Sequence, residues 1–494
     1  MSAFLTPLAP LLCLALGALA LMMADLWVER KSELAWLAFF VLLLSGGSSI
    51  ALWQSGVPQV PALLGSYLAF DALALWIDVL LCAVSACIVL FAADYLREHG
   101  LERGEFYVLQ LFATLGAMVL IRASDFLTLF IGLELLSLGV YSLVAFRRTS
   151  SRATEAALKY FLLGSFAAAL LLFGSALVYA ATGSTAFGKV GESVAQGEAF
   201  LPLLLLGMML VLIGLVFKLG AFPFHMWTPD AYEGAMSPVT ALMAGVVKIA
   251  AATTLLRLLC SAFAGPLASE EATGWPAVLT TLASLSMLGG SVAALVQRNV
   301  KRMLAYSSIA HAGYLLLGIA ATAGVGVQAS RAVLFYLLSY GVATCVSFGG
   351  LIVLGSRGAE AVDYDDLRGV GRRHRWASLP LAIGMLSLMG FPPLAGFLGK
   401  YYVFSAALSA GGSLIPAAVI GIVSSAIAAY AYLRVGVSMY LHEPLADGPV
   451  ARPMKSSPYV VAALAACVLL VIQLGVSPSM VLDSVAKAAA GLAP

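Results

Sequence analysis

Long apolar runs recur along the whole chain, separated by short polar stretches. A helix needs about 20 apolar residues to cross the hydrocarbon core of a bilayer. By that measure the pattern predicts fourteen membrane-spanning segments, at roughly residues 3–24, 34–53, 70–93, 106–121, 125–146, 155–181, 200–219, 237–262, 276–297, 302–322, 330–355, 377–410, 414–441 and 458–476. The runs lack the alternation of barrel strands, so we expect an all-α integral membrane protein.

The basic residues of the loops support this count. If successive loops alternate sides, one side carries Arg30, Lys31, Arg97, Arg103, Arg147, Arg148, Arg152, Arg298, Lys301, Arg302, Arg357, Arg368, Arg372, Arg373, Arg375, Arg452 and Lys455. The other side carries only Arg122, Lys189, Arg331 and Lys487. Lys and Arg concentrate in cytoplasmic loops. We therefore expect a bacterial inner membrane protein with both termini on the outer, periplasmic side.

Two of the segments are interrupted. Gly220 and Pro223 break the seventh segment, and Gly390, Pro392 and Pro393 break the twelfth. Proline removes a backbone donor, so both helices should unwind where protein or a hydrated cavity satisfies the freed groups. A pair of broken helices in corresponding halves is typical of transporters whose sites lie near the midplane.

A weak internal repeat accompanies the two breaks. Tyr160 and Tyr336 lie in similar stretches five helices apart, and Tyr141 and Tyr314 are spaced in the same way. An odd number of helices in each copy makes the copies inverted relative to each other. The predicted organisation is helices 1 to 3 in residues 1–105, a first five-helix repeat in 106–262, a second in 276–441 and helix 14 in 458–494.

Four ionisable residues lie deep within apolar segments: Glu134, Lys218, Lys248 and Lys400. A charge at membrane depth costs about 2.5 to 3.5 kcal/mol on insertion scales, so a retained charge usually has a function. Burial favours the neutral form of an amine and a nearby carboxylate favours the charged form, which suits a proton carrier. The structural alternatives are lysines that extend to the membrane surface and a static ion pair at Glu134.

Three further residues are secondary candidates for a proton relay. Lys159 lies four residues after Glu155, as in an ordinary helical ion pair, so a structural and a functional role are equally open. His225 and His311 titrate near neutral pH and could relay protons, or they could be packing residues beside the helix breaks.

The charged residues nearer the ends of the segments suggest simpler roles. We expect Asp71 and Asp78, near the start of the third segment, to face an interface or a partner chain. Arg257 and Arg434 are expected to be interfacial or paired with loop groups.

The amino-acid composition excludes several classes of function. The 494 residues are 62% hydrophobic and 11% charged, against about 25% charged in soluble domains. The net charge of +2 is small and the basic residues are dispersed among short loops, which excludes a nucleic-acid-binding surface. The six cysteines are scattered without a C-x-x-C pair, and no nucleotide-binding motif is present, so we expect no bound metal, cluster or other cofactor.

Several motifs resemble one family closely. The stretch from Phe222 to Ala235 (FPFHMWTPDAYEGA), followed by SPVT at 237–240, resembles the signature of subunit N of respiratory complex I, the proton-translocating NADH:quinone oxidoreductase. LELLS at 133–137, EAALKYF at 155–161, NVKRMLAYSSIAHAGY at 299–314 and GFPPLAGFLGK at 390–400 resemble it too. The resemblance covers nearly the whole chain and favours subunit N over its sister subunits L and M.

This resemblance implies a fourteen-helix, antiporter-like subunit built on inverted repeats, with helices 7 and 12 broken. Carried over by motif, Glu134 matches the family's helix-5 glutamate, and Lys218, Lys248 and Lys400 match its lysines on helices 7, 8 and 12. His225 and Lys159 coincide with polar positions of the family. Phe335 occupies the place of Lys159 in the second repeat, so proton routes in the two halves need not be equivalent.

The implied function is proton translocation in the membrane arm of complex I. The implied partners are the other membrane-arm subunits and the lipid bilayer, and NADH and quinone would be used by the whole complex, not bound by this chain. One alternative is an Mrp-type cation/proton antiporter subunit, but metal cations prefer oxygen ligands and the deep charges here are mostly lysines. A second alternative is a membrane scaffold that translocates nothing.

Overall fold

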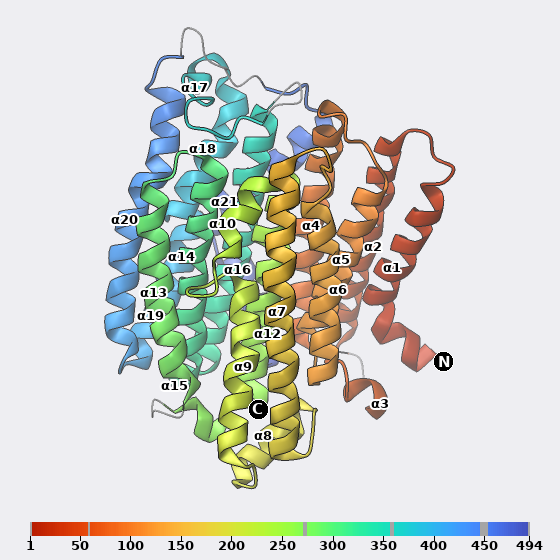
Figure 1. The fold of residues 1–494 in the computed structure, drawn as a ribbon, viewed down its shortest axis with the longest axis vertical. Helices are drawn as coiled ribbons and strands as arrows, with labels where there is room; N and C mark the ends of the chain where they lie inside the picture. Colours follow the sequence, from red (N-terminus) through yellow and green to blue (C-terminus); the bar gives the residue numbers. More distant parts are fainter. Residues whose placement is uncertain (1, 58–59, 270–273, 356–359, 445–452, 493–494) are drawn as a thin grey trace.

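The computed structural model describes residues 2–57, 60–269, 274–355, 360–444 and 453–492, and in these ranges the fold is an upright bundle of helices (Figure 1). Strand-type pairing in the described residues is limited to isolated bridges such as Asp125 with Ala186. The predicted all-α membrane architecture is confirmed.

Twelve helical spans in the described residues are long and apolar enough to cross a membrane. They are α1 (Ser2–Ala24), α2 (Lys31–Ser55), α4 (Ala72–Glu98), α6 (Phe126–Val144), α7 (Ser151–Thr182), α9 (Leu201–Leu219), the continuous span formed by α11 (Ser237–Leu242), a π-helical turn (Met243–Val247) and α12 (Lys248–Ser261), then α13 (Trp275–Leu295), α14 (Val300–Ala320), α16 (Val327–Leu354), α20 (Leu414–Tyr440) and α21 (Pro458–Val476). Two shorter apolar helices are α5 (Glu105–Ile121) and α18 (Arg375–Met389). Together they correspond to the fourteen predicted segments.

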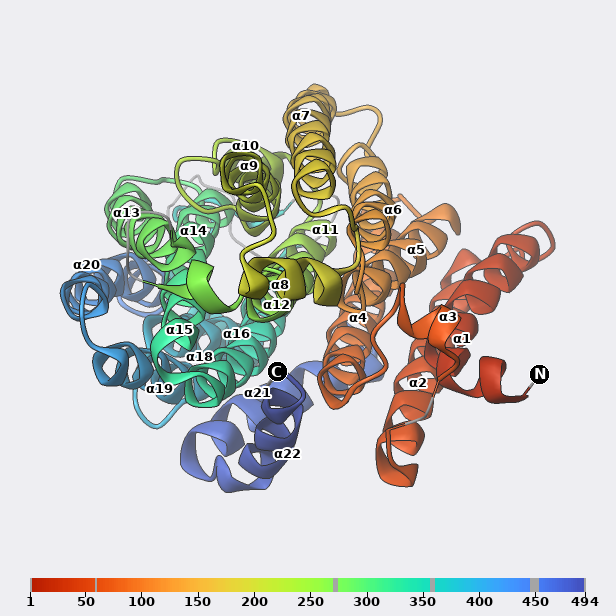
Figure 2. The ribbon, with the colours of Figure 1, turned by 90° about the horizontal axis from the view of Figure 1, so that it is seen from below.

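The remaining α-helices of the described residues are α3 (Ala62–Gly65), α8 (Phe187–Gln196), α10 (Trp227–Gly234), α15 (Thr322–Val325), α17 (Val370–Arg373), α19 (Ala395–Ala410) and α22 (Ser479–Ala490). In end view, α1 and α2 stand at one edge of the bundle and α20 at the other, with α12 and α16 between them (Figure 2). The region 458–494, predicted as one helix, contains both α21 and α22. Helix α22 is too short to span a membrane and instead buries Val485, Ala488 and Ala489.

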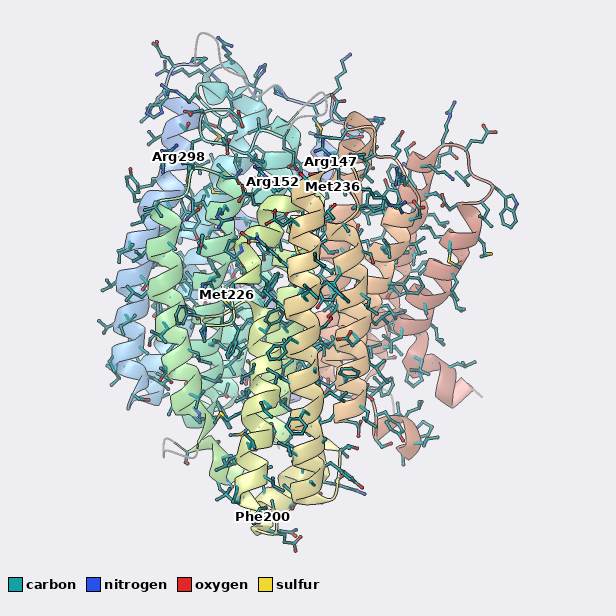
Figure 3. All side chains as sticks on the ribbon, in the orientation of Figure 1. Arg147, Arg152, Phe200, Met226, Met236 and Arg298 are labelled. Atoms are coloured by element: carbon teal, nitrogen blue, oxygen red, sulfur yellow. The ribbon has the colours of Figure 1, made fainter. Side chains whose placement is uncertain are left out.

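The loops alternate between two faces as predicted. Arg147, Arg152 and Arg298 lie near the same end of the bundle, and Phe200 lies at the opposite end (Figure 3). We call the first end the basic face. Both ends of the chain lie toward the other end (Figure 1).

Both predicted helix breaks are present. Helix α9 ends at Gly220 and the chain resumes as α10, while α18 ends at Gly390 and resumes as α19. The two glycines have φ of 74° and 90°, a left-handed conformation that favours glycine. Met226, in the first break, lies midway between the two faces (Figure 3). Trp227 Nε1 donates to the carbonyl of Phe217 at 2.9 Å, and the same oxygen accepts from the backbone N–H of Gly220 at 3.0 Å.

Glycines set the close approach of neighbouring helices. A Cβ on Gly174 of α7 would lie 2.7 Å from the carbonyl oxygen of Gly207 on α9, and a Cβ on Gly207 would lie 2.8 Å from the carbonyl oxygen of Gly174. Small residues allow membrane helices to pack backbone to backbone. This contact places α9, which carries Lys218, directly against α7.

Candidate functional site

Lys218 lies in the last turn of α9, immediately before the first break, and is buried. Its Nζ donates to Ser137 Oγ at 2.8 Å and to Tyr160 Oη at 3.2 Å. The ammonium also lies 5.1 Å from the ring centres of both Tyr141 and Tyr160. Hydroxyls and aromatic faces therefore surround this charge.

Glu134 lies on α6, one turn before Ser137, and is partly buried. Its Oε1 is buried and has no hydrogen-bond partner among the described residues. The carboxylate interacts electrostatically with Lys218, but the two do not form a direct ion pair in the described part of the chain. Ser137 binds the ammonium instead, so the static Glu134–Lys218 ion pair considered above is not formed.

Lys248 begins α12 directly after the π-helical turn, at the middle of the span from Ser237 to Ser261. Its Nζ donates to both the carbonyl oxygen and the hydroxyl of Ser308 on α14. The ring centre of Tyr340 lies 5.6 Å from the same nitrogen. Single π-helical turns within α-helices are frequent at functional sites.

Aromatic and hydroxyl groups connect the first two lysines. The ring of Tyr160, whose hydroxyl accepts a hydrogen bond from Lys218, stacks on Trp227 with ring centres 4.2 Å apart. Trp227 contacts Tyr232 edge to face at 6.4 Å. The hydroxyl of Tyr232 then hydrogen-bonds Ser308 at 3.2 Å, next to Lys248.

His311 lies between the second and third lysines. Its Nδ1 is 2.6 Å from the hydroxyl of Tyr336 and its Nε2 is 3.1 Å from that of Tyr432. Its ring lies 4.9 Å from that of Tyr340, which is beside Lys248, and 5.6 Å from that of Tyr314, which is beside Lys400. Of the secondary relay candidates, His311 is the one that the fold brings between two of the buried lysines in the described structure.

Lys400 lies in α19, just after the second break, and is also buried. Its Nζ donates to the carbonyl of Met389 at 2.9 Å and to Ser425 Oγ at 2.8 Å, and it lies 5.0 Å from the ring centre of Tyr314. The Met389 carbonyl belongs to the end of α18, so the break itself supplies an acceptor. Lys400 lines a largely apolar cavity of about 810 Å³ that also includes Phe391.

Lys159 and His225 lie apart from this row. The Lys159 side chain is 47% exposed and pairs with Glu155 at 2.7 Å and Asp230 at 2.9 Å. His225 stacks on Phe222 in the first break, and its Nδ1 has no hydrogen-bond partner among the described residues. Neither side chain contacts a buried lysine in the described structure.

The expectation that Asp78 faces an interface or a partner chain is wrong. Asp78 pairs with Arg122 in a fully buried contact, and Asp71 binds Arg257 through two hydrogen bonds of 2.5 and 2.9 Å. Arg257 is thus paired with a residue that precedes a helix, as expected. Burial raises the pKa of the Asp71 carboxyl, but the Arg257 guanidinium outweighs burial and leaves that pKa below its usual value.

The sequence also gave no indication of a polar cluster at the basic face. Glu360 accepts from Tyr95 at 2.9 Å, from the amide and hydroxyl of Ser237 at 2.9 and 2.5 Å, and from Lys301 at 2.9 Å. Lys301 also donates to the carbonyl of Ala235. The cluster borders a cavity of about 350 Å³ lined mainly by polar side chains. Glu360 lies in a loop, where acidic residues are common, so the sequence does not mark it as a candidate residue.

In the described residues, no group of three or more His, Cys, Asp or Glu is arranged to hold a metal ion. All six cysteines are free, although the sulfurs of Cys87 and Cys467 lie 3.6 Å apart.

Comparison with known proteins decides the family. Residues 123–428 match the family described as NADH:quinone oxidoreductase/Mrp antiporter, transmembrane. NADH-quinone oxidoreductase subunit N 1 of Sorangium cellulosum is 48% identical over 497 residues, which covers 97% of each chain. The chain belongs to the subunit N family. Another member, subunit N 2 of Roseiflexus castenholzii, is 41% identical and covers 94% of this chain and 91% of its own.

Solved structures extend this match to the fold. A chain of respiratory complex I from Thermus thermophilus with bound aureothin superposes with a TM-score of 0.79 at 34% identity, covering 97% of this chain and 99% of that one. A chain of the Mrp complex from Dietzia sp. superposes with a TM-score of 0.85 at 21% identity, covering 99% and 97%. At that identity the Mrp likeness shows a shared fold alone.

Proposed function

We propose that this chain is a proton-translocating membrane-arm subunit of an NADH:quinone oxidoreductase and that it works beside the other membrane-arm subunits. The membership of the subunit N family supports this role. On this proposal NADH and quinone react in other subunits, and the chain holds no redox centre of its own. Its contribution to the enzyme is the movement of protons.

One observation carries the proposal. Lys218, Lys248 and Lys400 are buried, and none of them belongs to an ion pair in the described part of the chain. A buried ammonium without a carboxylate ligand is held only by hydroxyls, carbonyls and aromatic faces, so it can exist in either protonation state. Such residues act as proton carriers more readily than as structural charges.

The proposed relay runs from Glu134 to Lys400. A change in the charge or position of Glu134 alters the proton affinity of Lys218, because the two interact electrostatically. The proton is displaced toward Lys248 and then toward Lys400, with His311 between these two lysines. Lys159 and His225 lie apart from this row, so they are not needed for it.

We also propose that residues 106–262 and 276–441 are the two inverted repeats, flanked by residues 1–105 and 458–494. The pair α9 and α10 would correspond to the pair α18 and α19, each interrupted after a glycine. In the bacterial inner membrane the basic face would be cytoplasmic, and both termini would lie on the outer side.

The main alternative is an Mrp-type cation/proton antiporter subunit, because the Dietzia Mrp chain shares the fold. Three deep ammonium groups oppose a bound Na⁺ or K⁺ by charge repulsion. The alternatives differ in one measurement, because a cation antiporter requires Na⁺ or K⁺ for proton movement and the proposed relay does not.

The test is proton pumping by the assembled complex in sealed vesicles. We expect Lys218→Ala and Lys248→Ala to lower the number of protons pumped per electron, because each removes a titratable amine from the row. Lys487→Ala, at an exposed position on α22, is the matched control and should pump normally. Full pumping by both buried-lysine variants would refute the relay, and normal assembly with impaired pumping would exclude a pure scaffold.

A further inference from the structure

The three buried lysines share a ligand type that their sequence neighbourhoods do not reveal. Each ammonium donates to the hydroxyl of a serine on a different helix. The pairs are Lys218 with Ser137 at 2.8 Å, Lys248 with Ser308 at 2.5 Å and Lys400 with Ser425 at 2.8 Å. The serines lie on α6, α14 and α20. Each ammonium also lies 5.0 to 5.6 Å from the ring centre of at least one tyrosine.

The chemistry of a hydroxyl explains why the same ligand recurs. A serine hydroxyl is both a donor and an acceptor, whereas a carboxylate can only accept and an alkyl group can do neither. It accepts from the ammonium of a charged lysine and donates to the lone pair of a neutral one. A carboxylate in the same place would favour the charged lysine and hold the proton.

We propose that Ser137, Ser308 and Ser425 are positioning residues of proton translocation, which hold each lysine nitrogen in one place in both its charged and its neutral form. This inference rests on the proposed function. The tyrosine faces add attraction for the charged form alone, worth about 0.5 to 2 kcal/mol. The serine hydroxyl is the ligand shared by all three lysines that can donate to the lone pair of the neutral amine, whereas carbonyl oxygens such as that of Met389 can only accept from it.

The proton count balances without a change at serine. When a lysine N–H bond breaks, the proton passes to the next acceptor along the row, and the hydroxyl rotates its own hydrogen toward the new lone pair. When the lysine is protonated again, the hydroxyl rotates back and accepts. Ser308 has a second partner in the hydroxyl of Tyr232 at 3.2 Å, so its rotation also alters the contact toward Lys218.

Ser425 is the best position for a test. It borders the cavity of about 810 Å³ beside Lys400, so a threonine methyl group has room there. Ser424, its neighbour on α20, is buried and its Oγ has no hydrogen-bond partner among the described residues. Ser424→Ala thus removes the same atom from the same helix without touching a lysine.

The variants Ser425→Ala, Ser425→Thr and Ser424→Ala are compared in the assembled complex in sealed vesicles, in H₂O and in D₂O. We expect Ser425→Ala to slow pumping-coupled turnover roughly tenfold, the order set by a hydrogen bond to a charged group. Its solvent isotope effect should rise because proton transfer at Lys400 becomes limiting. Ser425→Thr keeps the hydroxyl and should recover most of the rate, and Ser424→Ala should match the unmodified complex.

Two results would overturn the proposal: Ser425→Ala pumping like Ser424→Ala, or equal losses in Ser425→Ala and Ser425→Thr. If Ser425→Ala fails to assemble, Ser137→Ala gives the same comparison, with Ser142→Ala on the exposed side of α6 as its control. Normal pumping by Lys400→Ala would overturn the proposed function itself. Loss in Lys400→Ala together with control-like Ser425→Ala would overturn the serine role alone.

Discussion

Glu360 lies in the loop between α16 and α17, yet its carboxylate joins three helices that are distant in the sequence. Tyr95 reaches it from α4, Ser237 from the start of α11 and Lys301 from α14. Burial raises the pKa of Glu360, but Lys301 and Ser237 outweigh burial and lower that pKa to about 2. The group is therefore a fixed negative charge at neutral pH.

Replacing this charge should destabilise the basic face. A pKa that falls from 4.5 to about 2 on folding corresponds to roughly 3 kcal/mol of stabilisation. Because the folded pKa is the lower one, this stabilisation is present above about pH 4.5 and is lost as the pH falls toward 2. We expect Glu360→Gln to lower the unfolding free energy of the detergent-solubilised chain at neutral pH and to converge with the unmodified chain in acid.

Asp365→Asn is the control for this experiment, since the Asp365 side chain is 72% exposed and lies 3.7 Å from Arg368. An exposed pair of this kind contributes about 0 to 1 kcal/mol. A Glu360→Gln variant that unfolds like the Asp365→Asn variant would contradict a fixed charge at this site.

The candidate residues could be predicted from sequence to different extents. Lys218, Lys248 and Lys400 were predicted because a charge within an apolar run is conspicuous. Their serine partners were not, because hydroxyl residues are common in membrane helices and only the packing of other helices selects the one that meets an amine. Arg122 directly follows α5 in a turn, and its burial could not be predicted for the same reason, because its partner Asp78 lies on α4.

At the scale of the helices, the second break is covered from within the chain. Gly475 of α21 packs directly against the carbonyl oxygen of Pro393, with no room for a Cβ. This contact holds α21 across the unwound segment that precedes Lys400. Covering such a segment with protein is what membrane depth requires of non-helical backbone.

We therefore expect Gly475→Ala to destabilise the protein by about 1 to 3 kcal/mol, the usual cost of overpacking, although alanine is the better helix former. The measurement is the thermal unfolding midpoint of the solubilised protein. Gly436→Ala on α20 is the control, because a Cβ there meets nothing within 4 Å. A midpoint for Gly475→Ala at or above that of Gly436→Ala would contradict the close packing.

The spanning helices could be predicted from hydropathy because lipid imposes a minimum length on every apolar run. Their breaks could be predicted from the prolines that interrupt two of these runs. Helices α8 and α22 could not be predicted in this way. Both are short, with apolar residues on one side only, and their formation depends on the surfaces of the longer helices. Helix α22, for example, buries Val485 and Ala489 against the bundle.

At the scale of the whole molecule, the two faces differ in charge, and this difference predicts the orientation in the membrane. With the basic face cytoplasmic, Lys487 on α22 would lie outside and Arg373 in α17 inside. We expect a membrane-impermeant thiol reagent to label Lys487→Cys in intact cells and Arg373→Cys only in inverted vesicles. The unmodified protein, whose cysteines are buried or partly buried, is the control. Labelling in the reverse order would mean that the basic face is outside.

The Asp78–Arg122 and Asp71–Arg257 pairs have a consequence for any shortened version of the protein. Both carboxylates belong to the first 105 residues, and both guanidinium groups lie beyond them, Arg122 directly after α5 and Arg257 in α12. A truncation that kept only residues 106–441 would leave these two cations without their carboxylates in largely apolar surroundings, at several kcal/mol each. The spanning helices α1, α2 and α4 therefore cannot be removed without cost, and a shortened chain that lacks them would need neutral residues in place of Arg122 and Arg257.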